Sequence, residues 1–488
     1  MMEPITRRRA LQLGALGVGG TLVGGAGLVW VGTTRFEAEG GAPLSEPTSM
    51  HSKNGQLRVE LKASEGTVRV AGKNAMAFSY NDSLPGPTLH LRPGDRLQIR
   101  LSNQLRDPTN LHVHGLHVSP EGNGDNIFIT VDPGRSFDYA YQLPADHPPG
   151  VYWYHPHHHG MVADQIFAGL YGTIIVEEPK PVPVARERVL VISDITIDGS
   201  GRVKTASTGD RMMGREGELV LVNGQTLPTL TARPGERERW RIINACASRY
   251  LQLRLDGQQL QLLGMDSGHF ESPRDVSEVL LAPANRADLL VTTSEGTASL
   301  QALPFSRGSM MGMMGGTAPS VATGTTALAT LAVTGKRSAP LPAVPRQPES
   351  RDLRGQPVAR RRTLTFAMGM GGGMDMGMNG GMAFTIDGKK FDAKRVDHTV
   401  KAGSIEEWTI INSSPMDHPF HLHVWPMQLI EDNERDLSAP TWQDVVNIPA
   451  NGQIKILTAF DDFSGRTVYH CHILDHEDLG MMGVVEAV

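Results

Sequence analysis

The sequence predicts an all-β protein made of three consecutive antiparallel β-sandwich domains of the Greek-key type. A motif that occurs three times along the chain is the first observation behind this prediction. The second is a series of short β-rich or alternating runs bounded by Pro/Gly turns, at residues 97–101, 251–255 and 407–411. Helical periodicity is scarce after the N-terminus, and a chain of 488 residues fits about three domains.

The repeated motif is a short turn sequence with a central glycine, followed by an asparagine nine residues after that glycine. It occurs at residues 91–95, 232–236 and 400–404, with Asn103, Asn244 and Asn412. Three copies imply three related units. Nine and eleven residues beyond each asparagine stand His112 and His114 in the first unit, Leu253 and Leu255 in the second, and His421 and His423 in the third. The outer units therefore carry candidate metal ligands, whereas the middle unit carries none at these positions.

The three units and their connections follow from this spacing. We expect the first domain at residues 55–180, the second at 185–336 and the third at 363–488, with linkers at 32–54 and 337–362. The basic run 360–362 is expected in the second, solvated linker. A net charge of −6 without a sustained basic block argues against a nucleic-acid partner.

The N-terminal residues 1–31 have the pattern of a targeting segment. Three arginines at positions 7–9 precede a glycine-rich apolar stretch, which predicts a twin-arginine export signal. A retained membrane anchor is the alternative, because about twenty uncharged residues can span a bilayer. Seven glycines make that stretch weakly hydrophobic and favour the signal. The expected location is periplasmic or extracellular.

The segment His470-Cys471-His472, followed by His476 and Met481, predicts that two metal sites share one strand. Because successive side chains of a strand point to opposite faces, His470 and His472 would share one face and Cys471 the other. Cysteine, histidine and methionine are ligands of a blue-copper site, which needs a second histidine from elsewhere.

Histidines cluster in this chain more than structural roles would explain. A lone histidine is most often a satisfied core or surface residue. Here ten of 18 histidines fall in four short clusters, and one of the two cysteines lies between two of them. Each outer unit offers two His-x-His pairs, eight imidazoles in all, which suit a multinuclear cluster in the seam between the first and third units: His112, His114, His155, His157, His421, His423, His470 and His472. His418, Cys471, His476 and Met481 remain for a mononuclear copper nearby. Cys246 is expected to be a small buried residue.

Together these motifs resemble those of the multicopper oxidases, especially three-domain bacterial laccases and cuprous oxidases, over nearly the whole chain from about residue 55. The resemblance implies cupredoxin-like domains and four copper ions. His418, Cys471, His476 and Met481 would hold the type 1 copper, and His112 with His421 the type 2 copper. The type 3 pair would be held by His114, His155 and His472 on one side and by His157, His423 and His470 on the other. His117, His158 and His159 are left outside these sites.

The resemblance also implies a path for electrons and protons. A substrate would reduce the type 1 copper through an exposed histidine edge, and electrons would pass through Cys471 to a cluster that reduces O2 to water. Family members place a carboxylate beside the last type 1 histidine, which Glu477 matches. A second carboxylate follows the first His-x-His pair, where Asp125 is the expected residue and Asn123 the alternative.

Two methionine-rich runs suggest a substrate. Residues 310–314 and 368–382 hold ten of the 22 methionines, interleaved with glycines that disfavour a helix. Thioethers select Cu(I), so we expect the second run to recruit Cu(I) as an electron donor or to shield the type 1 site; a linker or a flexible apolar cover without a metal role is the alternative. Phenolic or aromatic donors are expected as well. Other possibilities are a dedicated cuprous oxidase, a copper-sequestering protein without turnover, and a structural relative that has lost its metals.

Overall fold

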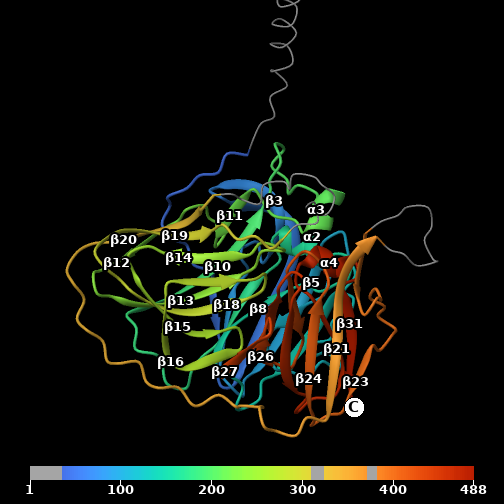
Figure 1. The fold of residues 1–488 in the computed structure, drawn as a ribbon. Helices are drawn as coiled ribbons and strands as arrows, with labels where there is room; N and C mark the ends of the chain where they lie inside the picture. Colours follow the sequence, from blue (N-terminus) through green and yellow to red (C-terminus); the bar gives the residue numbers. More distant parts are fainter. Residues whose placement is uncertain (1–35, 309–323, 371–381) are drawn as a thin grey trace, which may run out of the picture.

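The computed structural model describes residues 36–308, 324–370 and 382–488, and these residues form three β-sandwich domains. Six sheets, two in each domain, account for nearly all of the regular structure. In Figure 1 the second domain lies at the left and the third at the right. The predicted all-β fold class is confirmed.

The first domain packs a five-stranded sheet, β1-β4-β9-β8-β6, against a four-stranded sheet, β3-β2-β5-β7. The helix α2 precedes the last strand. The bounds of these elements are β1 Ser49–His51, β2 Gln56–Val70, β3 Lys73–Tyr80, β4 Thr88–Leu91, β5 Arg96–Gln104, β6 His112–His114, β7 Ser136–Gln142, β8 Gly150–His155, α2 Val162–Phe167 and β9 Gly172–Val176.

The second domain combines the sheets β11-β10-β13-β18-β15-β16 and β12-β20-β19-β14-β17. It also contains the short helix α3, which lies beside the third domain. The bounds are β10 Arg186–Ile195, α3 Thr208–Met213, β11 Leu219–Val222, β12 Thr229–Ala232, β13 Arg237–Asn244, β14 Leu251–Leu255, β15 Gln259–Met265, β16 Gly268–Val276, β17 Glu278–Leu281, β18 Arg286–Thr292, β19 Gly296–Leu303 and β20 Thr326–Val333.

The third domain combines the sheets β22-β21-β24-β29-β26-β27 and β23-β31-β30-β25-β28. Its helix α4 follows β30 directly. The bounds are β21 Arg360–Met370, β22 Met382–Ile386, β23 His398–Val400, β24 Ile405–Asn412, β25 His418–Leu422, β26 Met427–Asp432, β27 Arg435–Gln443, β28 Val445–Ile448, β29 Gln453–Ala459, β30 Gly465–Cys471, α4 Leu474–Asp478 and β31 Met482–Ala487.

The sheets are mixed: most strand pairs are antiparallel, as expected, but each domain also contains parallel pairs. In the first domain β2 runs parallel to β5, and the equivalent pairs β10·β13 and β21·β24 are parallel in the other domains. The chain leaves β2 through β3, enters the opposite sheet at β4, and returns to the first sheet as β5. A connection of this kind crosses between layers, which is what a parallel pair requires.

The repeated motif forms the same structure in each domain. Its glycine has a positive φ of 85°, 75° and 76° at Gly94, Gly235 and Gly403, in the turn between β4 and β5 and its two counterparts. Such a conformation favours glycine because it has no Cβ.

The asparagine of each motif is buried and connects three backbone segments. The Asn244 side-chain amide donates to the carbonyls of Arg249 and Leu281 at 2.8 and 3.0 Å, and its carbonyl accepts from the Cys246 N–H at 3.1 Å. Asn103 and Asn412 make the equivalent bonds. In each domain this asparagine fixes the loop before one strand: β6 in the first domain, β14 in the second and β25 in the third. The histidines of the outer units, and the leucines of the middle unit, stand on or directly after these strands.

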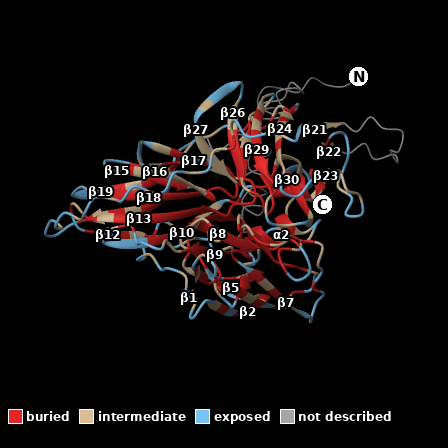
Figure 2. Ribbon diagram, turned by 90° about the horizontal axis from the view of Figure 1, so that it is seen from below, coloured by how far each residue is buried: buried red, intermediate tan, exposed pale blue. Residues whose placement is uncertain are grey.

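Each domain has an apolar core between its sheets, and a further core lies where the domains meet. This shared core includes Trp153 of the first domain, Ile243 of the second, and Val445 and Leu474 of the third. Figure 2 shows that buried positions continue through the strands of all three domains. The three units therefore pack as one body around the strands that carry the histidines.

The expected linkers are partly built into the domains. Residues 360–362 belong to β21, so the expectation of a linker there was wrong. Arg360 and Arg361 are exposed, as expected of a solvated run, whereas the side chain of Arg362 packs against Glu406 and donates to the Thr399 carbonyl. In the first linker, Gly41 and Leu44 donate to carbonyls of the second domain, and residues 49–51 form β1.

Several predictions concern residues that lie outside the described part of the chain. They are the N-terminal segment 1–31, the methionine run 310–314 and most of the run 368–382. Among the helices of the described residues, none has the length and apolar character needed to cross a membrane.

The asparagine connection can be tested in the second domain, away from the candidate copper ligands. Asn244→Ala leaves two buried carbonyls and one buried N–H without partners, so we expect the free energy of unfolding to fall by about 2–3 kcal/mol. Asn74→Ala, at an exposed position of β3, should change it by less than about 0.5 kcal/mol. Equal effects of the two substitutions in chemical denaturation would contradict this account.

Candidate metal centres

The first group of candidate ligands comprises His418, Cys471, His476 and Met481, and we call it the mononuclear group. His418 Nδ1 lies 3.3 Å from Cys471 Sγ, His476 Nδ1 lies 4.0 Å from it, and the two Nδ1 atoms are 3.4 Å apart. Burial raises the pKa of the Cys471 thiol, so a thiolate at this position requires a cation beside it. Met481 is fully buried in the same core, and its carbonyl accepts from the Cys471 N–H at 3.1 Å.

Hydrogen bonds behind both imidazoles leave their Nδ1 atoms free to bind an ion. His418 Nε2 donates to Ser414 Oγ at 2.8 Å, and this hydroxyl donates in turn to Asn412 Oδ1 at 2.7 Å. His476 Nε2 donates to the Met212 carbonyl at 3.3 Å. Burial lowers the pKa of His418 to about 3 and that of His476 well below its usual value, so both rings are neutral. Such partners orient the lone pairs of metal-binding histidines.

The mononuclear group is covered by the second domain. His418 and His476 are both fully buried, so the expectation of an exposed histidine edge was wrong. The helices α2 and α3 pack on α4, which carries His476 (Figure 1). Arg215, just after α3, donates to Asp475 Oδ1 at 2.6 Å and so connects the second domain to the residue before His476. The partly exposed Met212 of α3 lies between His476 and the surface.

The second group consists of the eight histidines of the His-x-His pairs, and we call it the eight-histidine cluster. Antiparallel pairing aligns His112 with His155 between β6 and β8, and His421 with His470 between β25 and β30. Rings from the first and third domains then stack on one another. The centroids of His112 and His423 are 3.8 Å apart, and those of His114 and His421 are 3.9 Å apart. The structure therefore places the cluster in the seam between these two domains.

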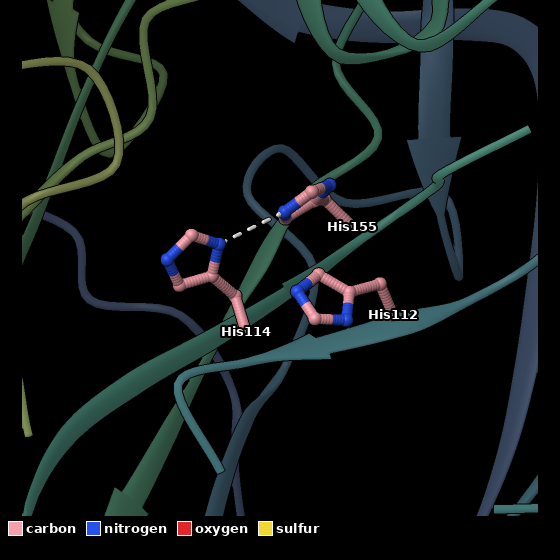
Figure 3. A group of neighbouring side chains, drawn as sticks. All are labelled: His112, His114 and His155. Carbon is pink, nitrogen blue, oxygen red and sulfur yellow. Dashed lines mark hydrogen bonds between the residues drawn. The ribbon is translucent and has the colours of Figure 1, made fainter. Parts of the chain in front are cut away.

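Within the cluster, ring nitrogens of neighbouring histidines converge. His114 Nδ1 and His155 Nε2 are 3.4 Å apart, beside His112 (Figure 3). His470 Nε2 lies 3.1 Å from His157 Nε2 and 3.1 Å from His423 Nε2. His472 joins from the third domain, with its ring centroid 5.1 Å from that of His114.

The partners of the opposite nitrogens show that the cluster fits metal ions. His112 Nδ1 donates to Asp125, His421 Nδ1 to the Asp444 carbonyl, and His155 Nδ1 to the Pro156 carbonyl. Six buried ring nitrogens have no hydrogen-bond partner at all: those of His112 Nε2, His157 Nδ1, His421 Nε2, His423 Nδ1 and both nitrogens of His472. Buried polar atoms without partners are rare and costly, and a cation would satisfy the one lone pair that each neutral ring carries. Burial also lowers the pKa of these rings, so lone pairs are available.

Comparison with known proteins identifies the family. Three family models, each described as multicopper oxidase, match residues 62–181, 153–329 and 365–488. A solved structure titled as a multicopper oxidase and metallo-oxidase from Campylobacter jejuni is 30% identical and superposes with a TM-score of 0.80. It covers 92% of this chain and 95% of its own. The chain belongs to the multicopper oxidase family.

Relatives within the family have different names. Multicopper oxidase mco of Staphylococcus haemolyticus is 28% identical over 452 residues, which is 90% of each chain. A Bacillus subtilis protein named laccase is 25% identical over 476 residues, covering 83% of this chain and 89% of its own. A Proteus mirabilis protein named cell division protein FtsP is 27% identical over 462 residues, covering 91% and 92%. Family membership implies copper binding, and the histidine groups fit copper sites.

In this multicopper oxidase the carboxylate next to the first His-x-His pair is Asp125. Both of its oxygens lie 2.9 Å from His112 Nδ1, and one accepts from the Val113 N–H at 3.0 Å. Asn123, the alternative, is exposed and donates to the Asp138 carbonyl. The loop between them depends on Gly124, because a Cβ there would lie 2.2 Å from the Ser119 carbonyl. Burial raises the pKa of Asp125 to about 8, which favours the protonated acid.

Glu477 is fully buried beside other histidines of the cluster. Its Oε2 is 3.1 Å from His470 Nδ1, and its Oε1 is 3.6 Å from His157 Nε2. His470 Nδ1 donates to the Cys471 carbonyl instead, so neither carboxyl oxygen has a hydrogen-bond partner.

Asp444 and Arg286 are functional residues that the sequence did not reveal. His114 Nε2 donates to Asp444 Oδ1 at 3.0 Å, and Arg286 of the second domain donates to both Asp444 oxygens at 2.5 Å. Asp266 lies 3.3 Å from the same guanidinium. Asp444 therefore holds histidines of both ligand-bearing domains, His114 through its carboxylate and His421 through its carbonyl. Arg286 and Asp444 are 158 residues apart in the sequence, and His114 and Asp444 are 330 residues apart, so no local spacing connects them.

Substitution of Asp444 tests whether it orients the cluster. Asp444→Asn keeps the size of the side chain but removes the charge that Arg286 and His114 share, so we expect the copper affinity of the cluster to fall about 10–100-fold. Copper content after dialysis against graded chelator measures this. Asp436→Asn, at an exposed position of β27, is the matched control. Equal copper retention by the two variants would show that Asp444 has no such role.

Proposed function

We propose that this protein is a laccase-like oxidase that couples one-electron oxidation of small donors to the four-electron reduction of O2 to water. The proposal rests mainly on the end of β30 and on His472, the residue that follows it. Cys471 points its sulfur at His418 and His476, whereas His470 and His472 on either side join the eight-histidine cluster. Two centres connected by one short stretch of backbone suit a transfer of electrons from one to the other.

We propose that these residues bind four copper ions. His418, Cys471, His476 and Met481 would hold a type 1 ion, His112 and His421 a type 2 ion, and the other six histidines a type 3 pair. When bound, copper supplies the redox centres that accept single electrons and pass them to O2. The chain itself holds the rings in place through Ser414, Asp125 and Asp444, and it excludes water from both groups by burial.

Reduction of one O2 to two waters consumes four electrons and four protons, and the buried acids are suited to supply protons. Asp125 lies next to His112, and Glu477 lies next to His470. Both are buried beside histidines of the cluster, and burial disfavours the charged form of Asp125. We propose that they hold and release protons for the reaction.

The buried mononuclear group restricts the electron donor. A donor at the surface of α3 would contact Met212, whose carbonyl accepts from His476 Nε2, and not the imidazole itself. An electron can cross the single layer of protein that Met212 forms over His476, but a bulky molecule cannot pass through it to the imidazole. We propose small phenolic or aromatic donors and Cu(I), with a dedicated cuprous oxidase as the alternative. A sequestering protein would have no need for a buried cluster linked to a thiolate.

Export is part of the proposal. The arginines at positions 7–9 and the apolar stretch after them support the twin-arginine pathway and a periplasmic or extracellular location, with retention as an N-terminal anchor as the alternative. Comparison of the N-terminus of the mature protein with the full sequence distinguishes cleavage from retention.

Replacement of the thiolate tests the proposed reaction. Cys471→Ser should abolish the strong visible absorption of the copper-loaded protein and reduce dye-dependent O2 uptake at least about 100-fold, because electrons lose their entry to the cluster. Cys246→Ser, a buried cysteine of the second domain, is the matched control and should retain both. A Cys471→Ser protein with unchanged O2 uptake would rule out the proposed route.

Deletion of residues 371–381 tests the recruitment of Cu(I). These residues lie outside the described part of the chain, and their methionine content supports the proposal. We expect kcat/KM for Cu(I) to fall at least about tenfold, because soft thioether ligands are lost, while the value for a small dye changes less than twofold. Steady-state rates on both donors measure this, and equal losses would count against recruitment.

A further inference from the structure

A third cluster of metal-ligating side chains lies on the first domain, away from both copper groups. β1, β4 and β9 are adjacent parallel strands at one edge of a five-stranded sheet, whereas β6, with His112 and His114, forms the opposite edge. Four strand spacings of about 4.8 Å place the two edges roughly 19 Å apart. His51, His90 and Glu177 come from these three strands or the residue after them.

Strand register puts the three side chains on one face of the sheet. His51 is the direct partner of His90 between β1 and β4. His90 is the partner of Ile175 between β4 and β9, and Glu177 stands two residues after Ile175. Because side chains two residues apart along a strand share a face, Glu177 projects beside His90.

The geometry of the cluster suits a single ion. Glu177 Oε1 lies 3.3 Å from His90 Nδ1 and 3.7 Å from His51 Nδ1, and one ligand atom of each residue lies within 4.8 Å of the others. Two ligands bound at about 2.0–2.1 Å with a tetrahedral angle are about 3.4 Å apart, so little movement is needed. The side chain of His51 is 56% exposed, which leaves room for water ligands.

The charges around the cluster leave its ligand atoms available. The imidazoles of His51 and His90 stack at 4.2 Å. Burial and the neighbouring His51 lower the pKa of His90, which keeps its lone pair free. Arg92 Nε is 3.4 Å from Glu177 Oε2, the oxygen that faces away from the histidines, so Oε1 is not shared with it. Arg241 is a second cation near His90.

We propose that His51, His90 and Glu177 bind one divalent transition-metal ion, Zn2+ or Cu2+, at a site separate from the copper centres. Two imidazoles and one carboxylate suit these ions and not a hard ion such as Mg2+. The ion would join β1 to β4 and β9. β1 has only three residues, and the segment before it bridges to Thr226 and Thr229 of the second domain. The ion would therefore fix β1 to the first domain, close to where the preceding segment bridges to the second.

Calorimetric titration of the copper-loaded protein with Zn2+ tests the site, because thioethers and filled copper centres do not compete for Zn2+. We expect the wild-type protein to bind one Zn2+ more than His90→Ala, and Glu177→Gln to weaken this binding at least about tenfold. Saturating Zn2+ should also raise the Tm of the wild-type protein but not that of His90→Ala, because the ion binds only the folded state.

His269→Ala is the matched control, since His269 is a partly exposed strand histidine outside this cluster. It should bind Zn2+ like the wild-type protein, and every variant should keep its visible absorption and dye oxidation. The proposal is overturned if wild-type and His90→Ala proteins give the same Zn2+ titration, if neither binds Zn2+, or if Mg2+ binds the wild-type protein equally well.

Discussion

The alternation of side chains at the end of β30 is the constraint on which the rest of the structure depends. Cys471 and its two histidine neighbours cannot share a face of an extended strand, so one strand must serve two groups of ligands. The same parity separates His418 from His421 on β25, the neighbouring strand, and from His423 just after it. The two adjacent strands thus supply ligands to both the mononuclear group and the eight-histidine cluster. Neighbouring residues of one strand therefore belong to different groups.

The middle domain has no ligand at the equivalent positions, yet both groups depend on it. Arg286 holds Asp444 against His114, and Arg215 holds Asp475 next to His476. Met212 closes the surface over His476. Each contact joins the second domain to the third, where the ligand strands β25 and β30 lie. The second domain therefore holds both groups in place, mainly through buried hydrogen bonds between charged side chains. Removing one partner of such a bond is strongly destabilising.

Much of this arrangement could be predicted from the sequence, because strand periodicity and local spacing encode it. The repeated motif predicted three domains, and its asparagine marked the histidine positions in two of them. Spacing could not reveal the parallel pairs, which arise when the chain crosses between sheets, nor that Arg362 is paired with Glu406. It could not reveal Asp444 and Arg286 either, and only the fold could choose Asp125 over Asn123. Contacts between distant residues depend on tertiary packing, which no local pattern contains.

The proposed reaction requires that Cys471 connect the mononuclear group to the eight-histidine cluster, so that electrons accepted at one centre reach the other. Anaerobic titration of the copper-loaded protein with a one-electron reductant, followed by a pulse of O2, tests it most directly. We expect each chain to take up four electrons, and we expect O2 then to restore the visible absorption within a single turnover. Uptake of one electron per chain, with no return of the absorption on exposure to O2, would contradict it.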